Sequence, residues 1–128
     1  MMRATLAVLA GLVVWVLVAT VLDWLLRVAI PGYAAAEPLM HFTLPMMIAR
    51  LAIPGALPTV VAGYASASIG PARRSVIAVL AILLFLVFLP AHYRYRALFP
   101  LWYHLVFLGS LLLLPWLGAR LRRSRPFP

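Results

Sequence analysis

The sequence of 128 residues contains no cysteine and no lysine, and its only acidic residues are Asp23 and Glu37. The lack of cysteine excludes disulfides, thiol nucleophiles, thiolate metal sites and dithiol relays. The sequence also contains no phosphate-binding glycine loop, dinucleotide fingerprint, nucleophile elbow or His-Glu-x-x-His motif. These absences argue against an enzyme, and we expect neither a cofactor nor a metal site.

The basic residues are eleven arginines, which bring the formal net charge to +9. Such an excess can indicate nucleic-acid binding. Here long apolar runs separate the arginines, as is typical of positive charges at the ends of membrane helices. We therefore expect no nucleic-acid partner. Arginine without lysine, together with abundant alanine, proline and leucine, is typical of GC-rich bacterial genomes, so we expect a bacterial inner membrane.

Hydrophobic residues make up 66% of the chain, against about 45–50% in a soluble domain. A soluble fold of this size has too little interior for that surplus, whereas a bilayer solvates it. The sequence predicts an all-α polytopic membrane protein, with a single domain over residues 1–128 and four transmembrane helices in a bundle. The expected spans are residues 5–30, 40–69, 75–92 and 100–118. A basic tail follows over residues 119–128.

Proline and glycine indicate where these helices end. We expect the first helix to end at Pro31-Gly32, the second at Gly70-Pro71 and the third at Pro90. Pro100 suits the first turn of the fourth helix, where a missing N–H costs nothing, and Gly118 lies near the end of that helix.

The stretch over residues 31–49 is unusually apolar for a loop. It is either an interfacial helix or an upward extension of the second helix. We expect the extension, as one long helix bent by Pro45, Pro54 and Pro58, because each proline removes a backbone hydrogen bond.

The distribution of arginine sets the expected orientation. One side carries Arg3, Arg73, Arg74, Arg120, Arg122, Arg123 and Arg125, whereas the other carries Arg94 and Arg96, with Arg27 and Arg50 near its boundary. Because cytoplasmic loops carry the arginine excess, we expect both termini in the cytoplasm. The basic tail is then a topological signal, or alternatively a site for anionic lipid or a cytoplasmic partner.

Small residues recur every four positions on the second span, at Gly55, Thr59, Gly63 and Ala67. Ala62, Ser66 and Gly70 form a second such stripe beside it. Small residues at this spacing let another helix backbone approach closely. We expect the second span at the centre of the bundle, whereas the third span is bulky on every side and should face lipid.

The charged residues inside the spans are the first candidate site. Asp23 and Arg27 are four residues apart on one helix face, and counting about 20 residues across the membrane core places Arg50 at the level of Asp23. Charges at such depth pair or line a functional cavity. We interpret the three as an ion pair that locks the first two helices, and alternatively as part of a proton or substrate pathway.

The outer rim is the second candidate site. It gathers polar and aromatic residues at Glu37, His41, His92, Arg94, Arg96, Trp102, Tyr103 and His104. An aromatic belt at the level of the lipid headgroups explains this composition. The alternative is a shallow pocket for a lipid or a quinone-like ring, with Arg94 or Arg96 holding a polar head.

Three short motifs resemble those of a known group of proteins. They are Ala-Gly-Tyr at 62–64, Phe-Pro-Leu-Trp-Tyr-His at 99–104 and Leu-Gly-Ala-Arg-Leu-Arg-Arg at 117–123. Over residues 45–123 the chain resembles small four-helix inner-membrane proteins of bacteria to which no activity is assigned. The resemblance implies a fold and a location, but no catalytic or binding residue.

Three functional hypotheses follow. The first is an accessory or structural membrane protein, either a homo-oligomer or a subunit of a larger complex, in contact with membrane lipid. The second is a small transporter or a lipid- or quinone-binding protein that uses Asp23, Arg50 and the outer rim. The third is a haem- or quinone-linked protein that uses His41, His92 or His104.

Overall fold

The computed structural model describes residues 2–69 and 74–123, with side chains to residue 122, and these residues form helices and turns with no strand. The long helices are α1 (Met2–Ala29), α4 (Leu57–Ile69), α5 (Arg74–Arg94) and α6 (Leu101–Arg123). Short elements lie between α1 and α4: α2 (Tyr33–Ala36), a 3₁₀ turn (Glu37–Leu39), α3 (Leu44–Arg50) and a π-helical segment (Leu51–Ala56).

Four helices are long and apolar enough to cross a membrane. They are Met2–Ala29, Leu44–Ile69, Arg74–Arg94 and Leu101–Arg122, the second being formed by α3, the π-helical segment and α4 without interruption. The predicted helical class and the four candidate spans are therefore confirmed.

The second span begins at Leu44, so the predicted extension is found over residues 44–49 but is wrong for residues 31–43. Gly32 and Met40 both adopt left-handed backbone conformations, with φ of 84° and 56°. These two residues turn the chain sharply and confine residues 33–39 to short helical turns. Thr43 is extended and its carbonyl accepts from the Met47 N–H at 2.9 Å. Pro45 then occupies the first turn of α3, where proline is well tolerated.

Two other predicted helix ends are also wrong. Pro90 lies inside α5, which continues to Arg94, and Gly118 lies inside α6, which continues to Arg123. Pro100 precedes α6, and its carbonyl accepts from the Tyr103 N–H at 3.1 Å. Gly118 serves packing instead, because a Cβ there would lie 1.9 Å from the Val60 carbonyl oxygen. The predicted stop at Gly70-Pro71, and Arg73 and Arg125, lie outside the described residues.

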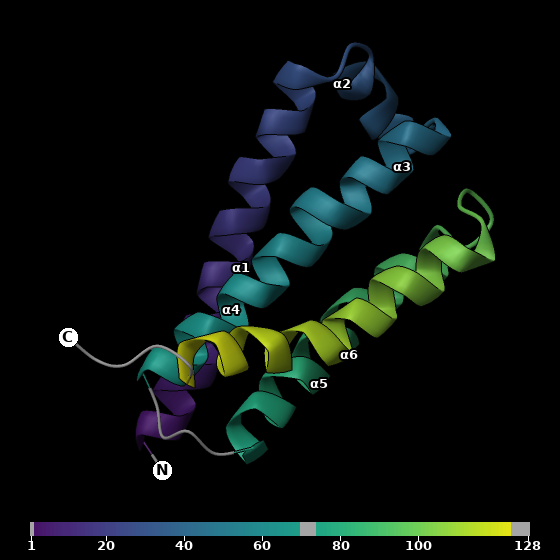
Figure 1. The fold of residues 1–128 in the computed structure, drawn as a ribbon. Helices are drawn as coiled ribbons and strands as arrows, with labels where there is room; N and C mark the ends of the chain where they lie inside the picture. Colours follow the sequence, from purple (N-terminus) through teal and green to yellow (C-terminus); the bar gives the residue numbers. More distant parts are fainter. Residues whose placement is uncertain (1, 70–73, 124–128) are drawn as a thin grey trace.

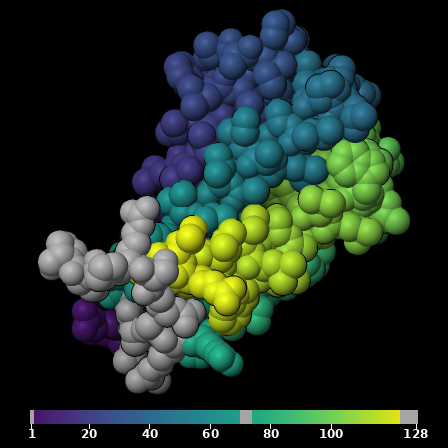
Figure 2. Space-filling view, viewed as in Figure 1, coloured from purple at the N-terminus to yellow at the C-terminus, as the bar shows by residue number. Residues whose placement is uncertain are grey.

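Helix α4 lies between α1 and α6 and makes its most extensive contacts with these two helices. The start of α1 and the end of α6 lie at one end of the molecule, whereas α2 and the turn between α5 and α6 lie at the other (Figure 1). The space-filling view shows α4 filling the surface between α1 and α6 on the viewed face (Figure 2). The described chain therefore crosses the length of the molecule an even number of times, and it begins and ends at the same end.

The backbones of α4 and α6 touch along one seam. A Cβ added at Gly63 would lie 2.1 Å from the Pro115 carbonyl oxygen, and Gly118 makes the reciprocal approach to Val60. Gly55 packs against Phe107, and the buried Thr59 accepts a hydrogen bond from Trp15 Nε1 at 2.9 Å. We call these contacts the glycine seam. They bury the predicted stripe within the chain, with Ala67 at its half-buried end.

Helix α5 has an inner and an outer face. Ile77, Leu80, Ala81 and Leu84 are buried, whereas Val79, Ile82, Leu86 and Val87 are exposed. In a helix apolar on every side, the exposed apolar face needs lipid as its solvent. The structure thus leaves one apolar face of α5 exposed, and lipid contact on this face stays a prediction.

Candidate functional site

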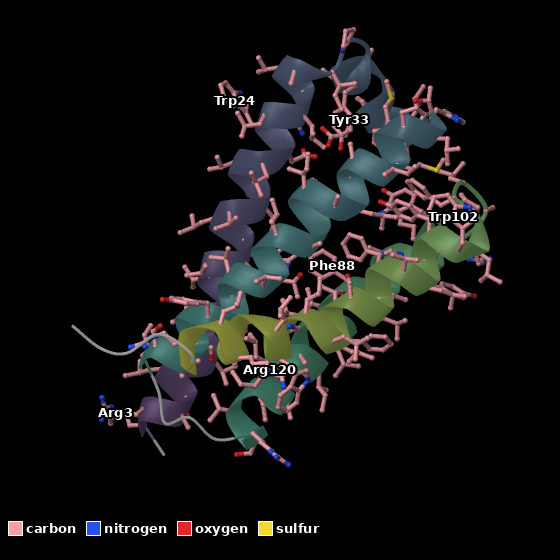
Figure 3. The ribbon with its side chains drawn as sticks, in the orientation of Figure 1. Arg3, Trp24, Tyr33, Phe88, Trp102 and Arg120 are labelled. Carbon is pink, nitrogen blue, oxygen red and sulfur yellow. The ribbon has the colours of Figure 1, made fainter. Side chains whose placement is uncertain are left out.

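Both acidic residues of the chain contact two arginines and a tyrosine. The tyrosine, Tyr33, lies at the end of the molecule that carries α2 (Figure 3). Asp23 and Arg27 come from the last turns of α1, Glu37 from the 3₁₀ turn and Arg50 from the end of α3. Arg27 pairs with Asp23 at 3.4 Å and more closely with Glu37. We call this group, with Tyr33, the charge network.

Arg50 is the centre of the charge network. Its Nη1 donates to Asp23 Oδ1 at 3.3 Å and to Glu37 Oε2 at 3.4 Å. The same nitrogen donates to the Tyr33 hydroxyl at 2.8 Å, and that hydroxyl donates to Asp23 Oδ1 at 3.0 Å. The guanidinium also lies over the Phe42 ring, 5.1 Å from its centroid. Two carboxylates thus balance two guanidinium groups, and the network is neutral as a whole.

Burial raises the pKa values of two groups of this network, Tyr33 and Glu37, which lie between the first and the second span. It raises the pKa of the Tyr33 hydroxyl above its ordinary value. Burial also raises the pKa of Glu37, and the hydrogen-bonded Asp23 carboxylate raises it further, against the two arginines. Glu37 therefore holds its proton more readily than a free glutamate does, although it lies beside two cations.

The helix is irregular directly after Arg50. Residues 51–56 form a π-helical turn that contains Pro54. Proline cannot donate to the helical ladder, and a π-helical turn inserts an extra residue into it, a feature frequent at functional sites. Along the chain, this turn lies between Arg50 of the charge network and Thr59 and Gly63 of the glycine seam.

Two histidines form a second polar pair close by. His92 in the last turns of α5 and His104 in the first turn of α6 approach with their Nδ1 atoms 2.7 Å apart. The rings cross at 81°, and the His92 ring packs on Phe107 at a centroid distance of 4.7 Å. His104 is 8% exposed, and its Nε2 is buried without a hydrogen-bond partner among residues 2–69 and 74–122. Such an unpartnered buried nitrogen is uncommon and calls for an explanation.

Two adjoining cavities lie beside the charge network and the histidine pair. A cleft of about 380 Å³ has Asp23, Arg27 and Arg50 on its wall; its other lining residues are Trp15, Ala19, Thr20, Trp24, Pro54, Phe88 and Phe107. A smaller cavity of about 130 Å³ is lined by His92, His104, Met40, Ala91, Tyr95, Phe99 and Tyr103, and shares Arg50, Phe88 and Phe107 with the cleft. Figure 3 labels Phe88 in the interior between α4 and α6.

The remaining rim residues are divided between the surface and an aromatic cluster. His41 is exposed; Arg94 lies over the Tyr95 ring at 5.6 Å, and Arg96 lies over Tyr93 at 4.2 Å. None of these three lines either cavity. Trp102 is 40% exposed, whereas Tyr103 is buried and stacks on Phe99 at 4.3 Å. The arginine beside the small cavity is therefore Arg50, and not Arg94 or Arg96 as the sequence suggests.

The sequence placed Asp23, Arg27 and Arg50 together, and the structure brings them together with Glu37. It missed two features. Tyr33 enters the network because the turn at Gly32 folds α2 back onto α1, and residue spacing gives no signal of that turn's direction. The histidine contact depends on how α5 and α6 meet, although the sequence separation of twelve between His92 and His104 makes a tight helical hairpin foreseeable.

Among residues 2–69 and 74–122, no group of three or more His, Cys, Asp or Glu side chains could hold a metal ion. No protein family, no curated protein and no solved structure matches the chain. The function is therefore argued from the site alone.

Proposed function

We propose that this chain is a multi-pass protein of a bacterial inner membrane, a four-helix bundle with cytoplasmic termini, that binds an amphiphilic molecule in the cleft beside the charge network. The observation that carries the proposal is the cleft of about 380 Å³, which is lined by both charged side chains and aromatic rings. Small-molecule sites have volumes of about 300–1,000 Å³ and combine an apolar lining with a few polar groups.

The position of the cleft suits a ligand that arrives from the bilayer. Thr20 and Trp24 at its edge are exposed on α1, a helix apolar enough to span a membrane. The rings of Trp15 and Phe88 line the cleft and pack against each other at an angle of 50°, with centroids 4.5 Å apart. An apolar chain can lie against these rings, while Arg50 and Asp23 meet a polar group. Ionisable residues at membrane depth mark functional sites in this way.

Binding is better supported than transport for a single chain. A pathway would have to continue from the cleft toward the end of the molecule where α1 begins. Between α4 and α6, that route meets the glycine seam, where Gly63 and Gly118 bring two backbones into contact. The seam favours a ligand that enters and leaves by the same side.

The accessory-subunit hypothesis has two supports in the sequence, the small-residue stripe and the lack of a catalytic constellation. The stripe is occupied by packing within this chain. Thr59 and Gly63 of that stripe are fully buried against α1 and α6 of the same chain. An interface with a second chain would have to use other residues.

The test fills the cleft with a side chain. Ala19 lines the cleft, so Ala19→Phe should expel the ligand, whereas Val21→Phe on the exposed face of the same helix should not. Native mass spectrometry of each variant, extracted gently from its membrane, counts the small molecules retained per chain. We expect about one in the parent chain and in Val21→Phe, and none in Ala19→Phe. Equal retention in all three would contradict the proposal.

A further inference from the structure

We infer that the small cavity beside His104 binds a six-membered ring that carries oxygen atoms on opposite edges, the head of a quinone or hydroquinone, while the ligand's apolar tail runs along the cleft. This inference rests on the proposed function, because the tail needs the cleft. It adds the chemical class of the ligand and a second polar anchor.

The size of the small cavity fits one ring. Its volume is about 130 Å³, and an apolar cavity of about 150 Å³ in another protein binds benzene. Flat aromatic groups line it. The rings of Phe99 and Tyr103 stack with their centroids 4.3 Å apart, and the centroid of the Phe107 ring lies 6.3 Å from that of Tyr103. Aromatic rings prefer offset or edge contacts with another ring at these separations. A branched headgroup would not use such walls.

Two polar side chains that line the small cavity, His104 and Arg50, can each bind one oxygen of such a ring. His104 Nε2 is buried and has no partner within the described chain. Arg50 lines the same cavity, and its bonds to Asp23, Tyr33 and Glu37 all use Nη1. The N–H groups of Nε and Nη2 remain for Tyr103 and for a ligand. One oxygen would meet His104, and the opposite oxygen would meet Arg50.

The histidine pair accommodates both oxidation levels of the ligand. A hydrogen bond between two Nδ1 atoms needs one donor and one acceptor, and the tautomer decides which is which. When neutral His104 accepts at Nδ1, its Nε2 carries hydrogen and donates to a quinone carbonyl. When His104 donates from Nδ1, its Nε2 is bare and accepts from a hydroquinone hydroxyl. The same geometry therefore satisfies the buried nitrogen in both cases.

The adjacency of the two cavities favours a tailed ligand over a phospholipid headgroup. Arg50, Phe88 and Phe107 line both cavities, so the cavities adjoin at these three side chains, and a tail would pass between them into the cleft. A phosphate needs a net positive site, but Asp23 and Glu37 already balance Arg27 and Arg50. The neutral, hydrogen-bonding head of a quinone matches the site better than an anion does.

The test compares two probes that share a tail, decyl-benzoquinone and decylbenzene, by native mass spectrometry titration of the purified full chain. We expect the parent chain to bind the quinone about tenfold more tightly, as one to two hydrogen bonds supply. His104→Phe should remove this preference and leave decylbenzene binding unchanged, which also shows that the variant folds. His41→Phe, which changes the exposed histidine, should keep the preference.

Equal binding of both probes to the parent chain would overturn the inference and leave the cleft proposal standing. A preference that persists in His104→Phe would do the same, because the oxygens would then have another partner. If neither probe binds and the parent chain retains no small molecule after gentle extraction, both proposals fail together.

Discussion

The glycine seam and the region around Arg50 are built on opposite principles within the same helix. At the seam, α4 and α6 are so close that Gly63 and Gly118 leave no space for a methyl group. Around Arg50 and the π-helical segment, the helices separate around two cavities, and a buried His104 nitrogen has no partner among the described residues. The helices leave no space between their backbones in the first region, whereas they leave two cavities in the second.

The difference separates what holds the helices together from what the molecule does. Protein interiors are close-packed, and each void or unpartnered polar atom costs stability. The same two helices reach backbone contact at the glycine seam, so the stability of the fold does not require cavities beside the charge network. Because stability does not explain the cavities, they are the place to look for a ligand.

The largest expected effect comes from adding one methyl group to the seam. In Gly118→Ala the new Cβ would lie 1.9 Å from the Val60 carbonyl oxygen and 2.7 Å from the Tyr64 nitrogen. Backbone atoms cannot move aside, so α6 must shift, at a cost of about 3 kcal/mol or more in the free energy of unfolding. Steric trapping in detergent or bilayer measures this loss.

The matched control for the seam is Gly109→Ala on the same helix. A Cβ at Gly109 meets nothing within 4 Å, and alanine is favoured over glycine in a helix by about 0.5–1 kcal/mol. We expect this variant to be as stable as the parent or slightly more so. A seam variant as stable as Gly109→Ala would show that the two backbones are not in contact.

The second effect concerns the balance of the charge network. Arg50→Leu leaves two carboxylates facing Arg27 alone, and the Arg50 side chain is only 23% exposed. Removing one partner from a largely buried pair costs about 2–3 kcal/mol after allowance for partial exposure. Adding Glu37→Leu restores the balance, so the double variant should recover part of the loss. A double-mutant cycle on unfolding free energies measures this coupling, and purely additive losses would argue against a single network.

A smaller effect is expected for the hydrogen bond between α1 and α4. Thr59→Val keeps the shape of the side chain but removes the acceptor of Trp15 Nε1. Hydrogen bonds between membrane helices contribute about 0.6 kcal/mol on average, and we expect a loss of about 1 kcal/mol because Thr59 is fully buried. Thr20→Val is the control, since Thr20 is exposed and bonds only within its own helix. Equal effects of the two variants on the free energy of unfolding would contradict the assignment.

The smallest expected effect is a dependence of stability on pH through Glu37. Its folded-state pKa lies above the ordinary value of 4.5, so the folded chain keeps the proton longer than the unfolded chain does. The resulting stabilisation is complete below pH 4.5 and is lost as pH rises through the folded pKa. Glu37→Gln should remove this part of the pH dependence in thermal unfolding between pH 4 and pH 8, whereas Arg96→Gln on the surface should leave it unchanged. A parent chain that gains stability over this interval relative to Glu37→Gln would contradict the sign.

The sequence predicted those features that depend on composition and on spacing within one helix. Long apolar runs identified the four spans, and the four-residue spacing of Thr59 and Gly63 identified the close-packed face. The distance of Asp23 and Arg50 from their helix ends placed them at the same level. Each of these inferences needs only the rise of a helix and the thickness of a bilayer.

The sequence did not predict those features of the fold that depend on a single backbone angle or on how helices cross. Met40 is not glycine, yet it adopts a left-handed conformation that ends the turns over residues 33–39. Pro90 lies inside α5 although proline is read as a stop, because membrane helices tolerate proline where neighbouring groups satisfy the freed carbonyl. The His92–His104 contact and the two cavities arise from how helices cross, which no local pattern encodes.

The most direct test of the account is to identify what the parent chain carries out of its membrane. Organic extraction of the gently purified protein, followed by mass spectrometry with quantitation per chain, reports both the class and the amount of bound molecule. The account predicts about one tailed quinone or hydroquinone per chain, enriched over its share of the bulk lipid and lost in Ala19→Phe. An extract that contains only phospholipids in their bulk proportions, identical for both chains, would contradict it.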